Sequence, residues 1–294
     1  MKALESILVV LDKPKHEPIA LDRARELQSA SGAQVRLVSF CWHPVGEQTA
    51  LIDGIDPNAV QEEIIAERRA WLAALELRMD GSKTTTEVVW AKDIATWVSD
   101  AVEAGRYDIV IKCVHHSETL LHTPLDWQLI RSCSAPLLIV SSEKRKRRTG
   151  NVLATLDLRR DDTDHQALNR EVLEATRYFA ELHGGVAHCV YAVEFSEVLR
   201  DLDVIDVRKV HDKAAAKASG ELETLIAPYE IAAENIHMPD GKVGKAVRGT
   251  AFKAKTDLVV VGTGTNKRGL MAILGNSAEK ILTRAPCDVL VIKL

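Results

Sequence analysis

Short apolar runs alternate with longer amphipathic segments along this chain, and the order of the runs repeats once. The matched runs are Ile7–Asp12 with Val152–Asp157, Tyr107–Cys113 with Thr256–Gly262, and Cys133–Val140 with Ala285–Ile292. In the first pair, each apolar run ends in an aspartate. Three matches in the same order indicate an internal duplication, in which each half has its own set of buried strands.

Segments between the matched runs carry apolar residues at helical spacing. Residues 18–31 have one apolar face and stop at Gly32, which predicts a helix with a glycine C-cap. Residues 168–182 show the same pattern before Gly184. Further helices are expected at 61–79, 94–104, 124–132, 204–226, 243–254 and 277–283, and further strands at 35–41, 87–90, 186–193 and 235–238.

Strands separated by helices indicate parallel pairing through right-handed crossovers. We therefore expect an α/β fold with two tandem, doubly wound, five-stranded parallel sheets, one in residues 1–142 and one in 150–294. In such sheets, ligands bind at the carboxyl ends of the strands, where the strand order reverses. Asp157 and the segment after Val261 should both open into that crevice in the second half.

The bulk composition excludes several classes of protein. With 294 residues, 46% apolar and 27% charged, the chain has the composition of a soluble globular protein. A net charge of −4 gives no overall footprint for nucleic acid, and the basic run Lys144–Arg148 is expected to be a solvated connector. The five cysteines show no CxxC pair and indicate reduced thiols. Without a signal peptide or a membrane span of about 20 apolar residues, the chain is expected to be cytoplasmic.

Glycines follow the apolar run Leu258–Val261. They stand at Gly262, Gly264, Gly269 and Gly275. Such a loop can turn backbone N–H groups toward phosphate, and a following helix adds the partial positive charge of its N-terminus. The same residues also fit a helix start without a ligand, in which Asn276 caps the helix and Glu279 completes a capping box. Spacing alone leaves both interpretations open.

These residues and the duplication resemble the universal stress protein family, in its tandem E-type form with two domains in one chain. The family's ATP-binding signature has a glycine, two residues, a second glycine, nine residues, a third glycine and a small polar residue. Gly262, Gly275 and Asn276-Ser277 match it, whereas Thr265 stands at the second glycine. The resemblance implies that ATP or another adenine nucleotide, with or without magnesium, binds at Asp157, Gly262, Thr263, Gly264, Thr265, Gly269, Gly275, Asn276 and Ser277.

The first half has no glycine in the corresponding loop, residues 113–127. Thr123, Pro124 and Asp126 instead form a good helix start, and this stretch resembles E-type proteins. We expect this domain to have lost phosphate binding, and to serve packing or bind something else. His115, His116 and His122 lack a ligand spacing, so no metal site is expected. All five tryptophans lie in this half and indicate core packing, with an apolar ligand pocket as the alternative.

Taken together, these features favour a stress-response protein that binds a phosphate-containing ligand in its second domain and acts on unknown protein partners without catalysis. The loop has no Walker lysine and no carboxylate pair, so binding is favoured over slow nucleotide hydrolysis, which is kept as an alternative. A ligand-independent scaffold is a further alternative. The fifth strands, Leu137–Ser141 and Asp288–Leu294, would be exposed apolar edges. In the family, domains dimerise through these edges, so we expect an intramolecular pseudo-dimer, with a homodimer as a further option.

Overall fold

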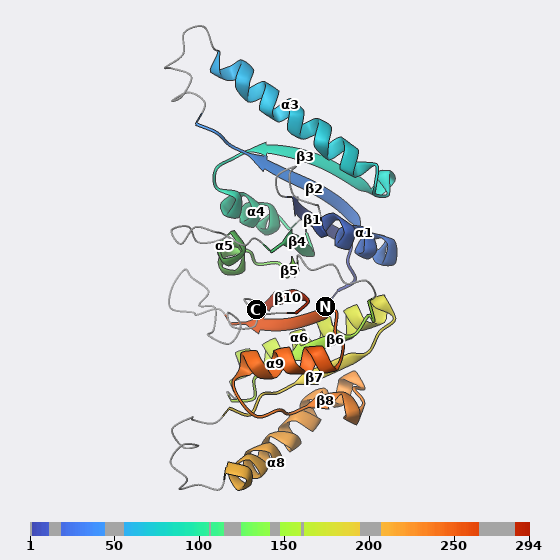
Figure 1. Cartoon of the computed structure of the whole chain (residues 1–294), viewed down its shortest axis with the longest axis vertical. Helices are drawn as coiled ribbons and strands as arrows, with labels where there is room; N and C mark the ends of the chain where they lie inside the picture. The colour runs from blue at the N-terminus through green and yellow to red at the C-terminus, as the bar shows by residue number, and fades with distance from the viewer. Residues whose placement is uncertain are drawn as a thin grey trace. The chain divides into compact units, whose positions relative to one another are not determined.

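The computed structural model describes residues 2–11, 19–44, 56–105, 107–114, 125–141, 148–159, 162–194, 207–264 and 286–294. The chain divides into two compact units, Lys2–Ser142 and Glu143–Leu294. Each unit is a parallel sheet accompanied by helices, which confirms the predicted doubly wound α/β fold (Figure 1). Within the described residues, no helix combines the length and the apolar character needed to cross a bilayer.

The first unit has the strand order β3-β2-β1-β4-β5, with all neighbours parallel. Helix α1 packs on β1, β4 and β5, helix α3 runs along β2 and β3, and α4 packs against α5 (Figure 1). The elements are β1 (Ser6–Leu11), α1 (Ile19–Ser31), β2 (Gln34–Cys41), α3 (Pro57–Glu76), the 3-10 turn Gly81–Lys83, β3 (Thr84–Trp90), α4 (Ile94–Glu103), β4 (Ile109–Cys113), α5 (Leu125–Ser132) and β5 (Leu137–Val140).

The second unit repeats this arrangement with the order β10-β9-β6-β7-β8, again with parallel neighbours. Helix α6 packs on β6, β7, β9 and β10. The elements are β6 (Val152–Thr155), α6 (Thr163–His183), β7 (Ala187–Val190), α8 (Val207–Ile226), the 3-10 turns Ala227–Tyr229 and Ala233–Asn235, β8 (Ile236–His237), α9 (Val243–Lys253), β9 (Leu258–Thr263) and β10 (Asp288–Lys293).

The first strand of each unit lies in the middle of its sheet. β1 pairs with β2 on one side and β4 on the other, and β6 pairs in the same way with β7 and β9. Leu153 stands opposite Val259 in the register of β6 and β9, so both strands end at the same edge. The strand order of the second unit therefore reverses between β6 and β9, as the sequence predicts.

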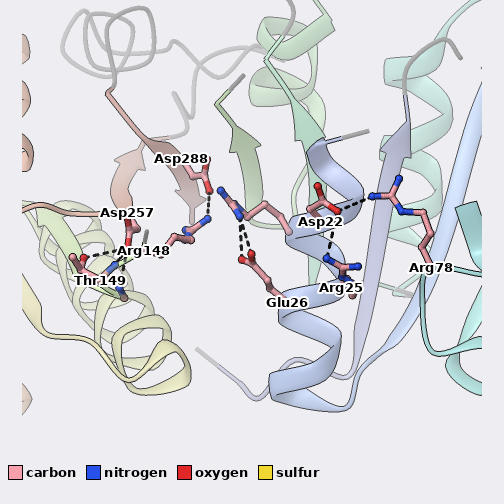
Figure 2. A network of polar contacts seen from close by, with 10 residues as sticks. Asp22, Arg25, Glu26, Arg78, Arg148, Thr149, Asp257 and Asp288 are labelled. Atoms are coloured by element: carbon pink, nitrogen blue, oxygen red, sulfur yellow. Dashed lines mark hydrogen bonds and ion pairs between the residues drawn. The ribbon is translucent and has the colours of Figure 1, made fainter. Parts of the chain in front are cut away.

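Equivalent aspartates close the start of the first strand in each unit. Asp108 Oδ2 accepts hydrogen bonds from the backbone N–H groups of Glu5 (2.9 Å) and Ser6 (2.8 Å). In the second unit, Asp257 Oδ2 accepts from the N–H groups of Thr149 and Gly150 and from the Thr149 hydroxyl, and Figure 2 shows the Thr149–Asp257 contact. The duplicated sequence match Tyr107–Cys113 with Thr256–Gly262 thus includes a duplicated strand anchor.

Ion pairs outside these anchors join neighbouring elements within each unit. Figure 2 shows the carboxylate of Asp22 on α1 between Arg25 and Arg78, whose nearest nitrogens lie at 3.6 and 3.0 Å. In the second unit, Arg148 at the end of the basic connector contacts Asp288 Oδ2 at 3.1 Å (Figure 2). Since Asp288 begins β10, this last basic residue ties the end of the connector to the first residue of that strand.

Most element boundaries follow the sequence pattern, with three corrections. β3 begins at Thr84 rather than at residue 87, because Thr84–Thr86 also pair with β2. Helix α3 begins at Pro57, four residues before the expected start, because the side chain of Asp56 caps its first turn. β7 is shorter than the expected strand at 186–193. The helix expected at 277–283 lies outside the described residues.

The predicted glycine caps are confirmed where the chain is described. Gly32 follows α1 with φ +75°, and Gly184 caps α6 with φ +64° in the left-handed region. The next residue, Gly185, crosses Gly150 so closely that an added Cβ would lie 2.0 Å from the Gly150 carbonyl carbon. Position 185 accepts no side chain, because the atoms that a Cβ would meet belong to the backbone of Gly150 and Asn151.

Candidate functional site

Asp157 follows β6 at the carboxyl edge of the second unit. Its backbone is held by Asn169 on α6, whose Oδ1 accepts from the Asp157 N–H at 3.1 Å and whose Nδ2 donates to the Asp157 carbonyl at 2.9 Å. Asn169 is buried, so its amide fixes the turn after the strand from inside the protein. The two hydrogen bonds place the Asp157 carboxylate at the edge where β6 and β9 end.

Arg159 bridges two carboxylates at this edge. Its Nε and Nη2 donate to Asp157 Oδ1 and Oδ2 at 2.9 and 3.0 Å, and its Nη1 donates to Glu194 Oε2 at 2.9 Å. Glu194, which follows β7, accepts at Oε1 from the N–H of Val243 at 3.0 Å. One guanidinium therefore links the segments after β6 and β7, and through Glu194 it reaches the first turn of α9.

The charge states at this edge follow from these contacts. Burial by itself would raise the pKa of Asp157, but hydrogen bonds from the side chain and backbone of Arg159, and its positive charge, outweigh burial and lower that pKa. The hydrogen bond to Asp157 raises the pKa of Arg159. Asp157 is accordingly a carboxylate and Arg159 a guanidinium at neutral pH.

The strand β9 ends at the same edge as β6. Three predicted site residues stand at its end, Gly262, Thr263 and Gly264, and their surroundings differ. A Cβ at Gly262 would lie 2.7 Å from Cγ of Leu168 on α6, so this glycine permits the close approach of α6. Thr263 is buried and its hydroxyl donates to the Ile292 carbonyl at 3.4 Å. A Cβ at Gly264 would meet no atom of the described residues within 4 Å. Of the three, Gly264 has the fewest neighbours within the part of the chain that the structure describes.

The remaining predicted contacts cannot be placed in this geometry. Thr265, Gly269, Gly275, Asn276 and Ser277 lie outside the described residues. The aspartate that ends the first matched run, Asp12, does too. The described part of the site therefore consists of Asp157, which follows β6, and Gly262 to Gly264 at the end of β9.

The first unit carries an internal ion pair at the corresponding strand. Lys112 on β4 is 1% exposed, and its ammonium lies 3.0 Å from Asp126 Oδ1 on α5 and donates to the Cys113 carbonyl at 2.8 Å. Asp126, expected from the sequence to begin a helix, lies in the first turn of α5. Lys112 occupies the position that Val261 holds in the duplicated run, so the two units differ here by a buried charge.

Metal-ligating groups do not gather in the described part of either unit. Among the described residues, no three histidine, cysteine or acidic side chains stand together so as to hold an ion. His115, His116 and His122 lie outside the residues that the structure describes.

The tryptophans of the first unit have separate environments. Trp97 on α4 packs edge-on against Phe40, with ring centroids 5.2 Å apart. Arg68 lies over the Trp71 ring, and Lys92 lies 4.8 Å above the ring of Trp42, which is 45% exposed. Trp42 is thus an aromatic surface close to the carboxyl end of β2, whereas Trp97 contributes to packing.

Sequence reasoning missed several polar residues of the second unit. Arg159 and Glu194 were not among the predicted site residues, although Arg159 lies two residues after Asp157. It also missed a histidine pair on adjacent strands: His188 Nδ1 lies 3.3 Å from His237 Nε2, with the rings stacked at 5.5 Å. His188 is buried and its Nε2 has no hydrogen-bond partner among the described residues. The two histidines are 49 positions apart in the sequence, so no local sequence pattern indicates the pair.

The family model described as "Universal stress protein family" matches residues 4–141 and 150–293 of this chain. Among curated relatives, "Universal stress protein E" of Salmonella typhi is 27% identical over 302 residues, covering 100% of this chain and 95% of the relative. The protein of the same name from Escherichia coli strain K12 is 26% identical with the same coverage.

Two solved structures resemble nearly the whole chain. A functionally unknown protein from Pseudomonas aeruginosa has a TM-score of 0.71 at 24% identity, covering 99% of this chain and 93% of that protein. A universal stress protein from Archaeoglobus fulgidus has a TM-score of 0.67 at 16% identity, covering 98% of both chains. At these identities the likeness concerns the fold.

Proposed function

The chain belongs to the universal stress protein family, as a tandem member with two such domains, and on that basis we propose that its second unit binds an adenine nucleotide or a related phosphate ligand. The site is the carboxyl edge of β6 and β9, with Asp157 on one side and the segment from Gly262 onward on the other. The protein acts in the cytoplasm as a conformational or partner-binding module, without catalysis.

The observation that carries this proposal is the reversal of strand order between β6 and β9. Parallel doubly wound sheets bind ligands where two crossovers leave the sheet in opposite directions, because the loops separate there. Asp157 follows one of these strands and Gly264 follows the other. An acceptor for hydroxyl or amine donors and a glycine backbone segment therefore stand at the same edge.

We assign the phosphate side of the ligand to the glycine segment. Gly264 supports this assignment, because an added Cβ there meets no atom of the described residues within 4 Å and a glycine lets a ligand approach the backbone closely. Thr265, Gly269, Gly275, Asn276 and Ser277 complete the proposed contacts, with or without magnesium. Thr263 contributes backbone atoms, since its hydroxyl is used inside the sheet.

A binding role is favoured over catalysis by the described acids. The carboxylates at the edge, Asp157 and Glu194, are both paired with Arg159. Phosphoryl transfer to water needs a positioned base and metal ligands. Two acids already held by hydrogen bonds from one guanidinium suit ligand recognition better than proton transfer.

Calorimetric titration of the full chain with ATP, with and without magnesium, tests the proposal. We expect micromolar binding that is weakened about tenfold or more, equivalent to about 1.4 kcal/mol, in Asp157→Ala and in Gly264→Trp. Gly264→Trp is chosen because no atom of the described residues lies within 4 Å of a Cβ added at Gly264. Gly220→Trp is the matched control: Gly220 is an exposed residue of α8, and an added Cβ there also meets no atom within 4 Å.

Each alternative has its own result in this experiment. Release of inorganic phosphate at a rate above that of Asp157→Ala would indicate a nucleotide hydrolase. Binding that survives both substitutions would move the site elsewhere in the chain. If no adenine nucleotide binds to the unmodified chain or to any variant of this edge, the proposal is wrong, and a ligand-independent scaffold or a binder of another ligand, such as an apolar one beside Trp42, becomes the better account.

A further inference from the structure

The group formed by Asp157, Arg159 and Glu194, called here the arginine latch, uses most of the hydrogen-bonding capacity of the Asp157 carboxylate. Asp157 Oδ1 accepts from the backbone N–H of Arg159 at 3.0 Å and from its Nε at 2.9 Å. A carboxylate oxygen has about two acceptor positions, so Oδ1 is full. Oδ2 accepts from Nη2 at 3.0 Å and keeps one position.

The latch is geometrically stronger than the ordinary surface ion pairs of this unit. Arg159 holds Asp157 by two parallel N–H donors and holds Glu194 by a third. Paired donors from one rigid guanidinium give the most specific form of carboxylate recognition. Arg177 and Glu181 on α6, by contrast, have one contact of 3.2 Å, with side chains 52% and 66% exposed. The Asp157 side chain is less exposed, at 38%.

Glu194 joins the latch to a helix end. Its other oxygen accepts from the N–H of Val243, the first residue of α9, while the N-cap Lys242 supplies no side-chain cap. An internal carboxylate thereby takes the position that favours an anion at a helix N-terminus. These two carboxylates and one guanidinium together carry one net negative charge, so the three side chains by themselves do not attract the phosphates of a ligand.

We propose that Arg159 is an autoinhibitory residue that competes with the ligand for Asp157 and keeps the site partly closed when no ligand is bound. This inference rests on the nucleotide site proposed above and concerns its regulation. A ligand hydroxyl or amine that requires both oxygens of Asp157 binds only after the guanidinium leaves. The measured affinity is then the intrinsic affinity reduced by the fraction of molecules in which the latch is open.

Removing the guanidinium should therefore tighten binding, which is the reverse of what a ligand-contacting arginine would do. For the full chain titrated with ATP, we expect Arg159→Ala to lower the Kd by about fivefold, near the upper limit for a partly exposed ion pair. Arg159→Lys keeps the charge but loses the paired donors, so an intermediate value is expected. Arg177→Ala is the matched control and should leave the Kd unchanged.

A second measurement separates the latch from phosphate electrostatics. Salt screens partly exposed charges, so raising the ionic strength from about 0.05 M to about 0.5 M should open the latch. Adenosine has no phosphate, and its affinity for the unmodified chain should rise with salt. In Arg159→Ala that rise should disappear, because no guanidinium competes.

The outcomes distinguish this inference from the proposed function. Tighter ATP binding in Arg159→Ala supports both, as does binding seen in that variant alone. Equal or weaker binding in Arg159→Ala, with normal binding by the unmodified chain and by Arg177→Ala, overturns the latch and leaves the nucleotide site intact. Absence of ATP and adenosine binding in every protein, Arg159→Ala included, overturns the proposed function and the latch with it.

Discussion

Asp108 and Asp257 perform the same task in the two units but in different surroundings. Each carboxylate accepts backbone N–H groups at the start of the first strand, yet Asp257 is 4% exposed whereas Asp108 is half-buried. The cost of leaving donors without their acceptor grows with burial, because water cannot replace the lost partner. The duplication therefore provides two versions of one anchor that differ in solvent access.

Replacing each anchor by alanine should show that difference. We expect Asp257→Ala to lower the free energy of unfolding by about 3 kcal/mol and Asp108→Ala by about 1 kcal/mol, measured by urea denaturation. Circular dichroism can follow both variants, whereas tryptophan fluorescence reports the first unit alone, because all five tryptophans lie there. Equal losses would mean that the burial of Asp257 does not strengthen its hydrogen bonds to Thr149 and Gly150.

The Lys112–Asp126 pair should behave as a coupled unit. Lys112→Met leaves a carboxylate without its ammonium, and Asp126→Leu leaves a buried ammonium without its carboxylate, so each should cost about 3–5 kcal/mol of unfolding free energy. The double variant removes both charges and should be more stable than either single variant. Thermal and urea unfolding of the four proteins form a double-mutant cycle, and additive losses would contradict the coupling.

The histidine pair predicts a pH dependence of stability. Burial, followed by the charge of His237, lowers the pKa of His188, and burial, followed by Lys253, lowers the pKa of His237. The unfolded chain then binds more protons than the folded one, so the stabilising contribution is present above the unfolded pKa of about 6.5 and is lost as the pH falls toward the folded values.

Urea unfolding between about pH 7.5 and about pH 5.5 measures that loss. A variant with His188→Gln and His237→Gln should show a smaller decrease in unfolding free energy over the same interval. Carboxylates elsewhere affect both proteins alike in this comparison. An unchanged slope in the double variant would assign the pH dependence to other groups.

The crossing of Gly150 and Gly185 predicts a position that accepts no side chain. Gly185→Ala would place a Cβ 2.0 Å from the Gly150 carbonyl carbon, and separating two backbone segments should cost about 3 kcal/mol. Gly220→Ala, within helix α8 and with open space around it, should instead stabilise the unit by about 0.5–1 kcal/mol. Differential scanning calorimetry of the two variants gives opposite shifts in Tm if this account is right.

The architecture was predictable because its signals are local or repeated. The matched runs around Asp108 and Asp257 indicate the duplication. Glycines after apolar helical faces indicate the helix ends at Gly32 and Gly184. The predicted β3 is too short, because the threonines Thr84–Thr86 give no apolar signal in the sequence. In the structure they pair with β2, and Thr84 is buried. Tertiary pairing decided that boundary, which the local pattern could not.

The arrangement of the candidate site was predictable in outline, and its polar contacts were less so. The sequence predicts that the aspartate after the first strand and the loop after the fourth strand open into one crevice, and the strand order brings Asp157 and Gly264 to one edge. The sequence does not show that Arg159 turns back onto Asp157, because a neighbouring arginine looks the same whether it is solvated or paired. Gly262 illustrates a second difficulty, since a glycine of a phosphate motif also meets the packing needs of Leu168. Only the structure shows that a glycine of the sequence motif is also required for helix packing.

The buried pair of Lys112 and Asp126 also bears on how this chain can change over time. A sequence that lost either partner alone would pass through a destabilised intermediate, whereas simultaneous or compensated exchange avoids it. Among relatives, a lysine at the first position and an acid at the second should accordingly appear or vanish together. The second copy, with valine at the matching place, carries no such mutual constraint and is free to diversify one residue at a time.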